Sequence, residues 1–579
     1  MFNTRLTTPL VLVLVFISTI TFSQVDEIGT EVVNIVKPYS PTISDAFKVK
    51  ETPILYDSIN TTKKEVQYGI FSVPVASTFT PAKGKAANVE KTKKIKLYDN
   101  YATLGFGNYT SILGEFFSNF QISRTDNFGL FFKHNSSQGG IDDIKLENKY
   151  YVTKLDGNYT SRQKDATYLL KVGVKHQLFN WYGLNGFFDE VSEEDLPDID
   201  AQQTYTSGNL GGSISLEDSF FEKGTLNLHY LSDAFSSSEI NVTANPEISI
   251  PLTDFTLIVD GELDYLNGNF ERNYMNTSSI NYSFLNAGIG PSLVYVNEDL
   301  TISLGVQGMV SIDLENSETE FFIYPRVNIS YRLLDEQVIA YGGTEGGLEQ
   351  NTYYNFKEEN PFVSPTLNVM PTSQLFNGFA GLKGKLSNSF GYNIRASYGK
   401  SENQALFIVN TFKGTGEQSE GYEYGNSFNV IYDDINTLSV FGELKIEPSE
   451  NFSLGINGTF YNFDTSNETE AWNLPELKAT VFSNFNFSEK VYGGVSIFYV
   501  GERKDMFTVL GGIFNLPFSE IVTLDDYIDA NVHLGYIVND QLSFFIKGSN
   551  LLSDSYEKWY NYPVQSIQGL LGATYKFDW

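Results

Sequence analysis

Cysteine is absent from the 579 residues of this chain, which excludes disulfides, thiol catalysis, cysteine metal sites and a lipid anchor on an N-terminal cysteine. Positive charge is scarce as well, since 39 Lys and Arg stand against 70 Asp and Glu, for a formal net charge of -31. Phosphate backbones need cations to neutralise them, so no nucleic-acid partner is expected. Solvated acidic surfaces explain the charge, and a vestibule that attracts cations is the functional alternative.

Long apolar runs are also missing after the N-terminus. Met1–Ser23 has the features of a signal peptide, with Arg5 ahead of the apolar stretch Pro9–Phe22 and small residues near its end. Cleavage before Gln24 is predicted, because the stretch is shorter than the ~20 residues of a membrane-spanning helix; a retained anchor is the alternative. No later segment holds ~18 consecutive apolar residues, so any membrane insertion must be made by strands.

Aromatic residues, in contrast, are abundant. They make up 15% of the chain, with 46 Phe and 36 Tyr, although the mean hydropathy is only -0.20. This mixture is too polar for a bundle of membrane helices and unusually aromatic for a soluble protein. It suits a membrane barrel, whose strands face lipid on one side and water on the other, with aromatic girdles at both interfaces.

Alternating hydrophobicity recurs from about Leu97 onward, in stretches of ~10 residues separated by turns or polar loops. In Thr301–Leu314 one face is aliphatic and the other polar, with Met309 as the apolar exception. Successive side chains of a strand point to opposite faces, so this pattern predicts a lipid-facing and a wet face. Phe545 is a similar exception in a later strand. Frequent glycines in these stretches are expected to let the wall curve and to leave room in the lumen.

The C-terminal residues favour a closed barrel over a soluble β-sandwich, which also shows alternation. A barrel needs a final strand that reaches the seam with an apolar lipid-facing side. About 480 barrel residues at ~22 residues per strand and connector predict roughly 22 strands. The connectors predicted to be long include Tyr182–Gln203 and Arg503–Leu524. The residues predicted to form the closing strand alternate to the last one: Leu571, Ala573, Tyr575, Phe577 and Trp579.

The C-terminal 110 or so residues resemble the barrel of TonB-dependent receptors, where an Asn-Leu-Leu and an aromatic-Pro pair bracket the last long loop. Ser566–Gln568 departs from the Gly-Arg usual after that proline. The resemblance implies a 22-stranded barrel, occluded by an N-terminal plug that an energy-transducing partner, TonB, remodels by pulling on a short segment. The residues that carry it are Leu474-Pro475, Lys478-Ala479, Tyr499–Arg503, Asp525–Asp529, Asn539–Ser543, Gly548–Asp554, Trp559–Pro563 and Gly569–Trp579.

The N-terminal segment, residues 24–96, departs from the family, because its roughly 70 residues are about half of a full plug. A segment this short favours the plug-less alternative over energised transport. The segment contains a run that resembles a TonB box and could add as an edge strand to a partner sheet; an ordinary short strand is the alternative. A Lys-rich stretch, residues 83–96, either sits in an acidic lumen or is a solvated linker. The TonB-box-like run is Thr30, Glu31, Val32, Val33, Asn34, Ile35 and Val36.

No catalytic or metal-binding constellation is evident. The four histidines lie far apart in the sequence, and nothing around His134 suggests a Ser-His-Asp hydrolase. Asp189–Asp200 is acidic but lacks the glycine-punctuated spacing of a calcium loop. We therefore expect no enzyme activity, no cofactor and no metal.

The sequence thus predicts an all-β, transmembrane antiparallel barrel in the outer membrane. Its domains are a signal peptide (1–23), an N-terminal segment (24–96) and the barrel (97–579). The leading hypothesis is TonB-dependent-receptor-like uptake or passage of a ligand, captured by the long loops, with the N-terminal segment as gate. The alternative is a plug-less scaffold for surface lipoproteins or an envelope complex. The implied partners are outer-membrane lipid, the barrel assembly machinery during insertion, and TonB or a surface lipoprotein.

Overall fold

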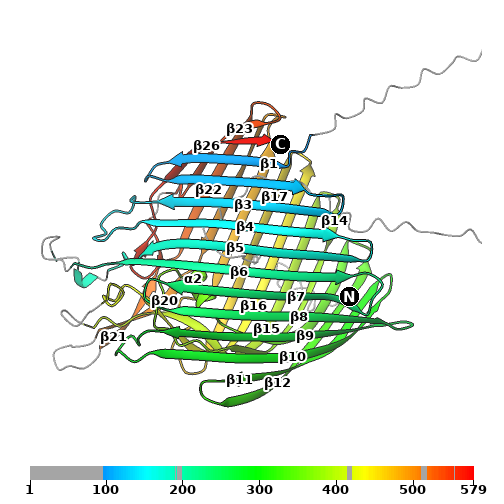
Figure 1. Cartoon of the computed structure of the whole chain (residues 1–579), viewed down its shortest axis with the longest axis horizontal. Coiled ribbons are helices and arrows are strands. Elements are labelled where there is room, and N and C mark those ends of the chain that lie inside the picture. The colour runs from blue at the N-terminus through cyan, green and yellow to red at the C-terminus, as the bar shows by residue number, and fades with distance from the viewer. Residues whose placement is uncertain are drawn as a thin grey trace, which may run out of the picture. The chain divides into compact units, whose positions relative to one another are not determined.

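Twenty-two antiparallel strands form one closed sheet in the computed structural model, which describes residues 96–184, 186–188, 191, 198–413, 420–509, 518–552 and 555–579 (Figure 1). The ring closes because β1 pairs with β2 on one side and with β26 on the other. The predicted fold class and strand number are confirmed. The barrel strands are β1 (Asn100–Gly107), β2 (Ile112–Gln121), β3 (Asp126–Ser137), β4 (Tyr150–Arg162), β5 (Ala166–Asn180), β6 (Gln202–Leu216), β7 (Phe221–Asp233), β8 (Ser238–Pro251), β9 (Thr256–Phe270), β10 (Ile280–Val296), β11 (Leu300–Asp313), β12 (Glu318–Leu334), β13 (Val338–Glu349), β14 (Thr372–Ser387), β15 (Phe390–Val409), β16 (Phe428–Ser449), β17 (Phe452–Thr465), β18 (Leu477–Asn486), β19 (Val491–Val500), β22 (Tyr527–Ile537), β23 (Leu542–Ser549) and β26 (Gln568–Phe577).

Connectors alternate between short turns at one end of the barrel and long loops at the other. The turns at the first end have two to four residues each. Because outer-membrane barrels place short turns in the periplasm and long loops outside, the long-loop end is the external one. Figure 1 shows α2, β20 and β21 at this end. The longest connectors there are 181–201, 350–371, 410–427, 501–526 and 550–567.

A few short elements lie within these connectors. The connector predicted as Arg503–Leu524 is not a plain loop, because it holds a hairpin of β20 (Arg503–Val509) and β21 (Phe518–Leu524). A smaller hairpin joins β24 (Glu557–Trp559) to β25 (Tyr562–Pro563). Among the described residues, the helical elements are the 3-10 turn η1 (Gly186–Phe188) and α2 (Tyr353–Glu359). No helix within the described ranges has the length and apolar character needed to cross a membrane.

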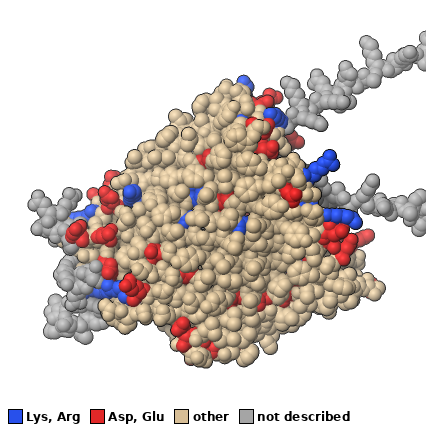
Figure 2. All heavy atoms as spheres, viewed as in Figure 1, with Lys and Arg blue, Asp and Glu red and all other residues tan. Residues whose placement is uncertain are grey.

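The outer face of the wall is apolar along the middle of the strands. In β11, Leu304 and Val306 are 51% and 42% exposed, whereas Met309 and Ser311 on the other face are 3% and 5% exposed. The predicted alternation is therefore confirmed, and Met309, its exception, lies inside. Figure 2 shows the visible charged side chains mainly at the two ends of the barrel, with a largely uncharged band between them. An exposed apolar band of this extent is stable in lipid rather than in water.

Glycines make room for aromatic side chains that face the lumen. The Phe545 ring, only 5% exposed, lies over Gly572 of the neighbouring strand, where an added Cβ would overlap it. The ammonium of Lys547 lies 5.3 Å from the centroid of the same ring. Phe545 can therefore lie on an otherwise polar face because Gly572 of the adjacent strand leaves room for its ring.

The seam joins β26 to β1 through eight register pairs from Asn100↔Phe577 to Gly107↔Leu570. Inside the barrel, the Thr103 and Thr574 hydroxyls are 2.8 Å apart. Trp579 lies beyond the strand, where its indole donates to the Ser118 hydroxyl at 3.2 Å. Four of the five residues predicted for the closing strand lie in β26: Leu571, Ala573, Tyr575 and Phe577.

Candidate functional site

Residues 350–371, the connector between β13 and β14, fold into the lumen at the external end; we call them the inserted loop. Most of their side chains are buried, unlike those of a solvated loop. Thr352 caps α2 by accepting from the Asn355 N–H at 3.0 Å. Behind the helix, the Ser364 N–H donates to the Phe428 carbonyl at 2.9 Å, which fastens the loop to the start of β16.

Helix α2 bridges opposite walls of the barrel. The Lys357 ammonium donates to the Gln177 side chain in β5. On the other side of the helix, the rings of Phe356 and Phe407, the latter in β15, meet edge to face at 5.9 Å. Strands β5 and β15 lie ten apart in a ring of 22, almost diametrically opposite. The inserted loop therefore spans the lumen.

An apolar core fills the space around the inserted loop; we call it the mouth core. It joins the loop to the lumenal side of strands from both halves of the barrel and to the β24–β25 hairpin. Burial of aromatic and aliphatic side chains of this size is the main favourable term holding the loop in place. Its buried members are Tyr205, Leu231, Leu266, Phe270, Tyr282, Phe284, Tyr353, Phe356, Val363, Leu367, Val369, Phe407, Val409, Phe428, Val430, Trp559 and Tyr562.

A buried carboxylate of the wall holds the start of α2. Glu239 of β8, 3% exposed, accepts from the Tyr353 and Tyr354 N–H groups at 2.6 and 3.0 Å. It also accepts from the Tyr282 hydroxyl at 2.8 Å. The first N–H groups of a helix have no partner within the helix, so the carboxylate satisfies donors that would otherwise be buried unpaired.

A buried lysine lies on the same helix. Lys357 is 1% exposed and pairs with the Glu358 carboxylate, and its ammonium lies 4.4 Å from the centroid of the Tyr354 ring. Burial lowers the pKa of Lys357 to about 8, and the neighbouring Glu358 carboxylate only partly opposes this shift. The charged ammonium is therefore less favourable in the packed inserted loop than in water.

Closure of the inserted loop is expected to strengthen between pH 8 and pH 10.5. The pKa of Lys357 is about 8 when packed and 10.5 in water, so the packed state binds fewer protons in this window and gains stability as pH rises. The full shift corresponds to about 3 kcal/mol. Hydrogen-exchange protection of residues 350–371, corrected for intrinsic rates, measures the stability of the packed loop at each pH. Lys357→Met should abolish the rise in protection with pH. The control Lys385→Met, at the short-turn end, should keep it. The same rise in Lys357→Met as in the parent would contradict an origin in the Lys357 ammonium.

The β5–β6 connector also packs inward, over the inserted loop. The Trp181 indole donates to the Phe362 carbonyl at 3.0 Å. The Tyr182 ring meets the rings of Phe362 and Tyr562 at 5.7 and 4.8 Å. Tyr182, the first residue of the predicted capture loop Tyr182–Gln203, and Trp181 just before it thus contribute to closure of the lumen.

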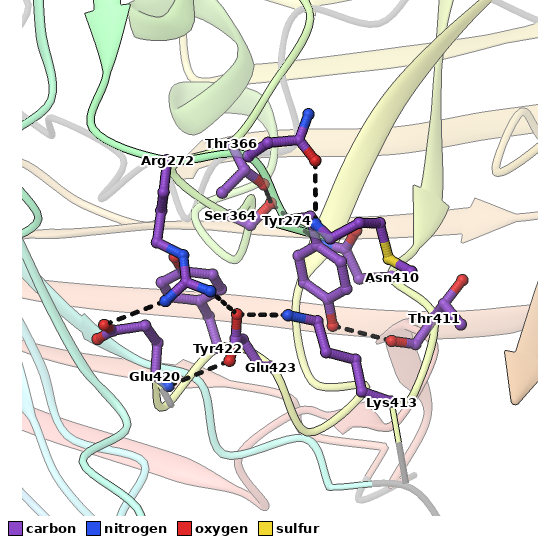
Figure 3. A network of polar contacts seen from close by, with 12 residues as sticks. Arg272, Tyr274, Ser364, Thr366, Asn410, Thr411, Lys413, Glu420, Tyr422 and Glu423 are labelled. Carbon is purple, nitrogen blue, oxygen red and sulfur yellow. Dashed lines mark hydrogen bonds and ion pairs between the residues drawn. The ribbon is translucent and has the colours of Figure 1, made fainter. Parts of the chain in front are cut away.

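Ion pairs join two further external connectors (Figure 3). The fully buried Glu423 carboxylate accepts from Arg272 at 2.9 Å and from Lys413 at 2.6 Å. The Lys413 ammonium also lies 4.7 Å from the centroid of the Tyr274 ring. Two cations around one buried carboxylate give a hydrogen-bonded arrangement that is costly to break. It holds connectors 271–279 and 410–427 together.

The β20–β21 hairpin is fixed by a buried aspartate. Asp505 accepts from the Val409 N–H at 3.0 Å and from the Asn473 amide at 2.8 Å. Burial raises the pKa of Asp505 to about 6. Seven connectors, those that follow β5, β9, β13, β15, β17, β19 and β23, thus contact one another at the external end.

A lumenal cavity of about 480 Å³ lies where the inserted loop leaves the wall; we call it the stem pocket. It is lined by strands β10 to β15 and includes Glu349 and Thr372, the residues that flank the loop. The stems of the inserted loop are its first and last residues, next to Glu349 and Thr372. Asn351 joins the two stems by donating to the Thr372 hydroxyl at 2.8 Å and to the Met370 carbonyl at 2.9 Å.

The structure locates some of the residues singled out in the sequence. Thr30–Val36, the Lys-rich stretch except Lys96, and most of Asp189–Asp200 lie outside the described residues. His134 pairs with the Thr153 hydroxyl at 2.8 Å, and the four histidines lie in four different strands. Within the described ranges, no cluster of three or more His, Asp or Glu side chains could hold a metal ion.

The alternation pattern does not predict the inserted loop. The available signal was a stretch between two alternating segments that carries Tyr353, Tyr354, Phe356 and Phe362, too aromatic for a solvated loop. Glu239 and Lys357 gave no comparable signal, because an acidic residue in a strand and a basic residue in a loop are ordinary in such a chain.

No protein-family model matches the chain, and no curated protein matches its sequence. Solved structures do match. The ferripyoverdine receptor of the outer membrane of Pseudomonas aeruginosa is similar with a TM-score of 0.59 at 13% identity, covering 84% of this chain and 72% of the receptor. The FrpB iron transporter from Neisseria meningitidis gives 0.61 at 10% identity, covering 83% and 82%. The ferric-catecholate import receptor Fiu from E. coli K12 gives 0.59 at 11%, covering 84% and 82%.

The chain therefore shares the fold of these solved structures, a closed antiparallel barrel. The barrel expected from the resemblance to TonB-dependent receptors is confirmed as a fold, and its location is the outer membrane, where closed barrels with an apolar outer belt reside. The similar structures named above are receptors and transporters rather than enzymes.

Proposed function

We propose that this chain is a TonB-dependent-receptor-like protein that serves uptake or passage of a ligand across the outer membrane. External loops capture the ligand, the N-terminal segment 24–96 acts as a gate, and TonB engages Thr30–Val36 as an added strand. The barrel assembly machinery inserts the barrel, and outer-membrane lipid solvates its apolar belt.

The observation that carries this proposal is the inserted loop. An open diffusion pore needs a free lumen, whereas here α2 reaches from β5 to β15 and the mouth core surrounds it. A ligand that enters from outside must move this loop. Passage through such a barrel requires a conformational step, as expected of a gated receptor rather than of a porin.

Deletion of Thr30–Val36 tests the role of TonB. We expect the deleted protein to lose binding to the purified periplasmic domain of TonB, because the edge strand that pairs with the partner sheet is gone. A strain carrying the deletion should grow like one that lacks the whole protein, in competition with the parent. Biolayer interferometry and the growth competition measure the two effects.

Deletion of residues 80–86, a segment of equal length farther along, is the matched control and should leave binding to TonB unchanged. Heat-modifiable mobility in gels verifies that each barrel is folded. If uptake and envelope phenotypes survive the loss of Thr30–Val36, energised transport is refuted.

The second candidate function is a scaffold for a surface lipoprotein or an envelope complex. The observation in its favour is the interlocked external end, where Glu423 is buried between Arg272 and Lys413. A rigid external surface of this kind is suited to holding a partner. Copurification of a stoichiometric lipoprotein, undiminished by deletion of Thr30–Val36, would favour the scaffold over the receptor.

A further inference from the structure

The stem pocket has a lining that selects for a chemical class of ligand. Eight of its fourteen lining residues carry uncharged hydroxyl or amide side chains, and Leu348 is the single apolar side chain among them. Its volume of about 480 Å³ lies in the range of small-molecule sites, ~300–1,000 Å³. It therefore offers many hydrogen-bonding groups and little apolar surface.

Several of these polar groups are free to bind a ligand. In the part of the chain that the structure describes, the side chains of Asn328, Gln374 and Gln404 form no hydrogen bond with other protein groups. Each amide presents both a donor and an acceptor to the cavity. Gln307 donates to Glu262 at 2.7 Å, which leaves its carbonyl oxygen as an acceptor.

Two of the three charged residues of the lining are paired with residues outside it. Arg326 pairs with the Asp260 carboxylate at 2.7 Å. Glu345 lies 3.6 Å from the guanidinium of Arg395. Glu349 adds one further negative charge to the rim. An anionic metal chelate would meet one paired cation and an excess of carboxylates, so the lining disfavours it.

The wall is irregular where the pocket forms. The β14–β15 register shifts between Gln374 and Phe376, and the β15–β16 register shifts between Ser401 and Gln404. Asn403, inside the second irregularity, has a φ of 52°, a left-handed conformation that asparagine tolerates. Bulges re-aim side chains at binding sites. Gly347 adds space, since a Cβ built there would meet no other atom within 4 Å.

We propose that the stem pocket binds a neutral, polyhydroxylated solute of mono- or disaccharide size. The hydroxyls of such a solute donate to and accept from the amides of β12, β14 and β15. The proposal rests on the proposed function, since a solute passing through the lumen would reach this site beside the stems of the inserted loop. Binding there is nevertheless measurable without transport.

The experiment uses the full chain in a detergent without a sugar headgroup, such as an amine oxide. Glucose, maltose, sucrose and N-acetylglucosamine are the neutral probes, and glucuronate and citrate are the anionic ones; calorimetry and saturation-transfer NMR report binding. We expect saturable binding of at least one neutral saccharide. The double substitution Gln374→Leu and Gln404→Leu should weaken it about tenfold or more, since each ~1.4 kcal/mol of lost hydrogen bonding is tenfold in Kd.

Gln121→Leu, at the short-turn end of β2, is the matched control and should bind like the parent. The proposal is overturned if no neutral saccharide binds saturably, if glucuronate or citrate binds more tightly, or if the double substitution leaves the affinity unchanged. The two proposals can fail separately. If deletion of Thr30–Val36 leaves uptake and envelope phenotypes unchanged while the saccharide still binds, energised uptake is refuted and the stem pocket remains a binding site.

Discussion

Shortening the inserted loop is expected to open the barrel to ions. The change replaces residues 353–368 with Gly-Ser-Gly in a chain that also lacks 24–96. Removal of α2 takes away the bridge between β5 and β15 and most of the loop side of the mouth core, so water and ions fill the lumen. Single-channel recording in planar bilayers should show large, steady conductance steps.

Four proteins are needed to interpret this result: the parent, the loop-shortened chain, the chain without 24–96, and the double variant. If the inserted loop and segment 24–96 can each close the lumen without the other, only the double variant conducts fully. The N-terminal gate is therefore tested in the loop-shortened background, where unchanged conductance after removal of 24–96 would refute it. A double variant as silent as the parent would contradict closure by the inserted loop.

Removal of the Glu239 carboxylate is expected to release α2 while leaving the barrel folded. Glu239→Ala leaves three buried donors without an acceptor: the N–H groups of Tyr353 and Tyr354 and the hydroxyl of Tyr282. Unsatisfied buried donors cost ~1–3 kcal/mol each, so the closed loop should lose about 3 kcal/mol or more. Hydrogen-exchange protection of residues 352–357 should fall about a hundredfold or more, at ~1.4 kcal/mol per tenfold.

Glu247→Ala in the same strand is the matched control, because no hydrogen bond joins that carboxylate to the inserted loop. Glu239→Gln keeps an acceptor oxygen and should show an intermediate loss of protection. Equal protection in Glu239→Ala and the parent would show that the mouth core alone holds the helix. Unchanged protection of the barrel strands in every variant verifies that the effect is local.

The long-range contacts of the external end explain why it escaped prediction. Glu239 and Tyr353 are 114 residues apart in the sequence, and Lys357 and Gln177 are 180 apart. A repeating pattern of two residues reports which face of a strand is apolar, but it carries no information about which distant loop that face meets. Met309 and Phe545 illustrate this limit, since both look like defects in a polar face until their lumenal neighbours are known.

The sequence by itself determined the membrane barrel, its approximate strand number and its lipid-facing side, because each strand repeats the same local alternation between lipid and water. It also pointed to the external connectors by their length. Only the tertiary structure decided that residues 350–371 turn into the lumen, that Glu239 and Lys357 hold them there, and that a polar pocket opens at their stems. Those features arise from side chains of distant strands meeting inside a closed ring, and closure of the ring is what brings them together.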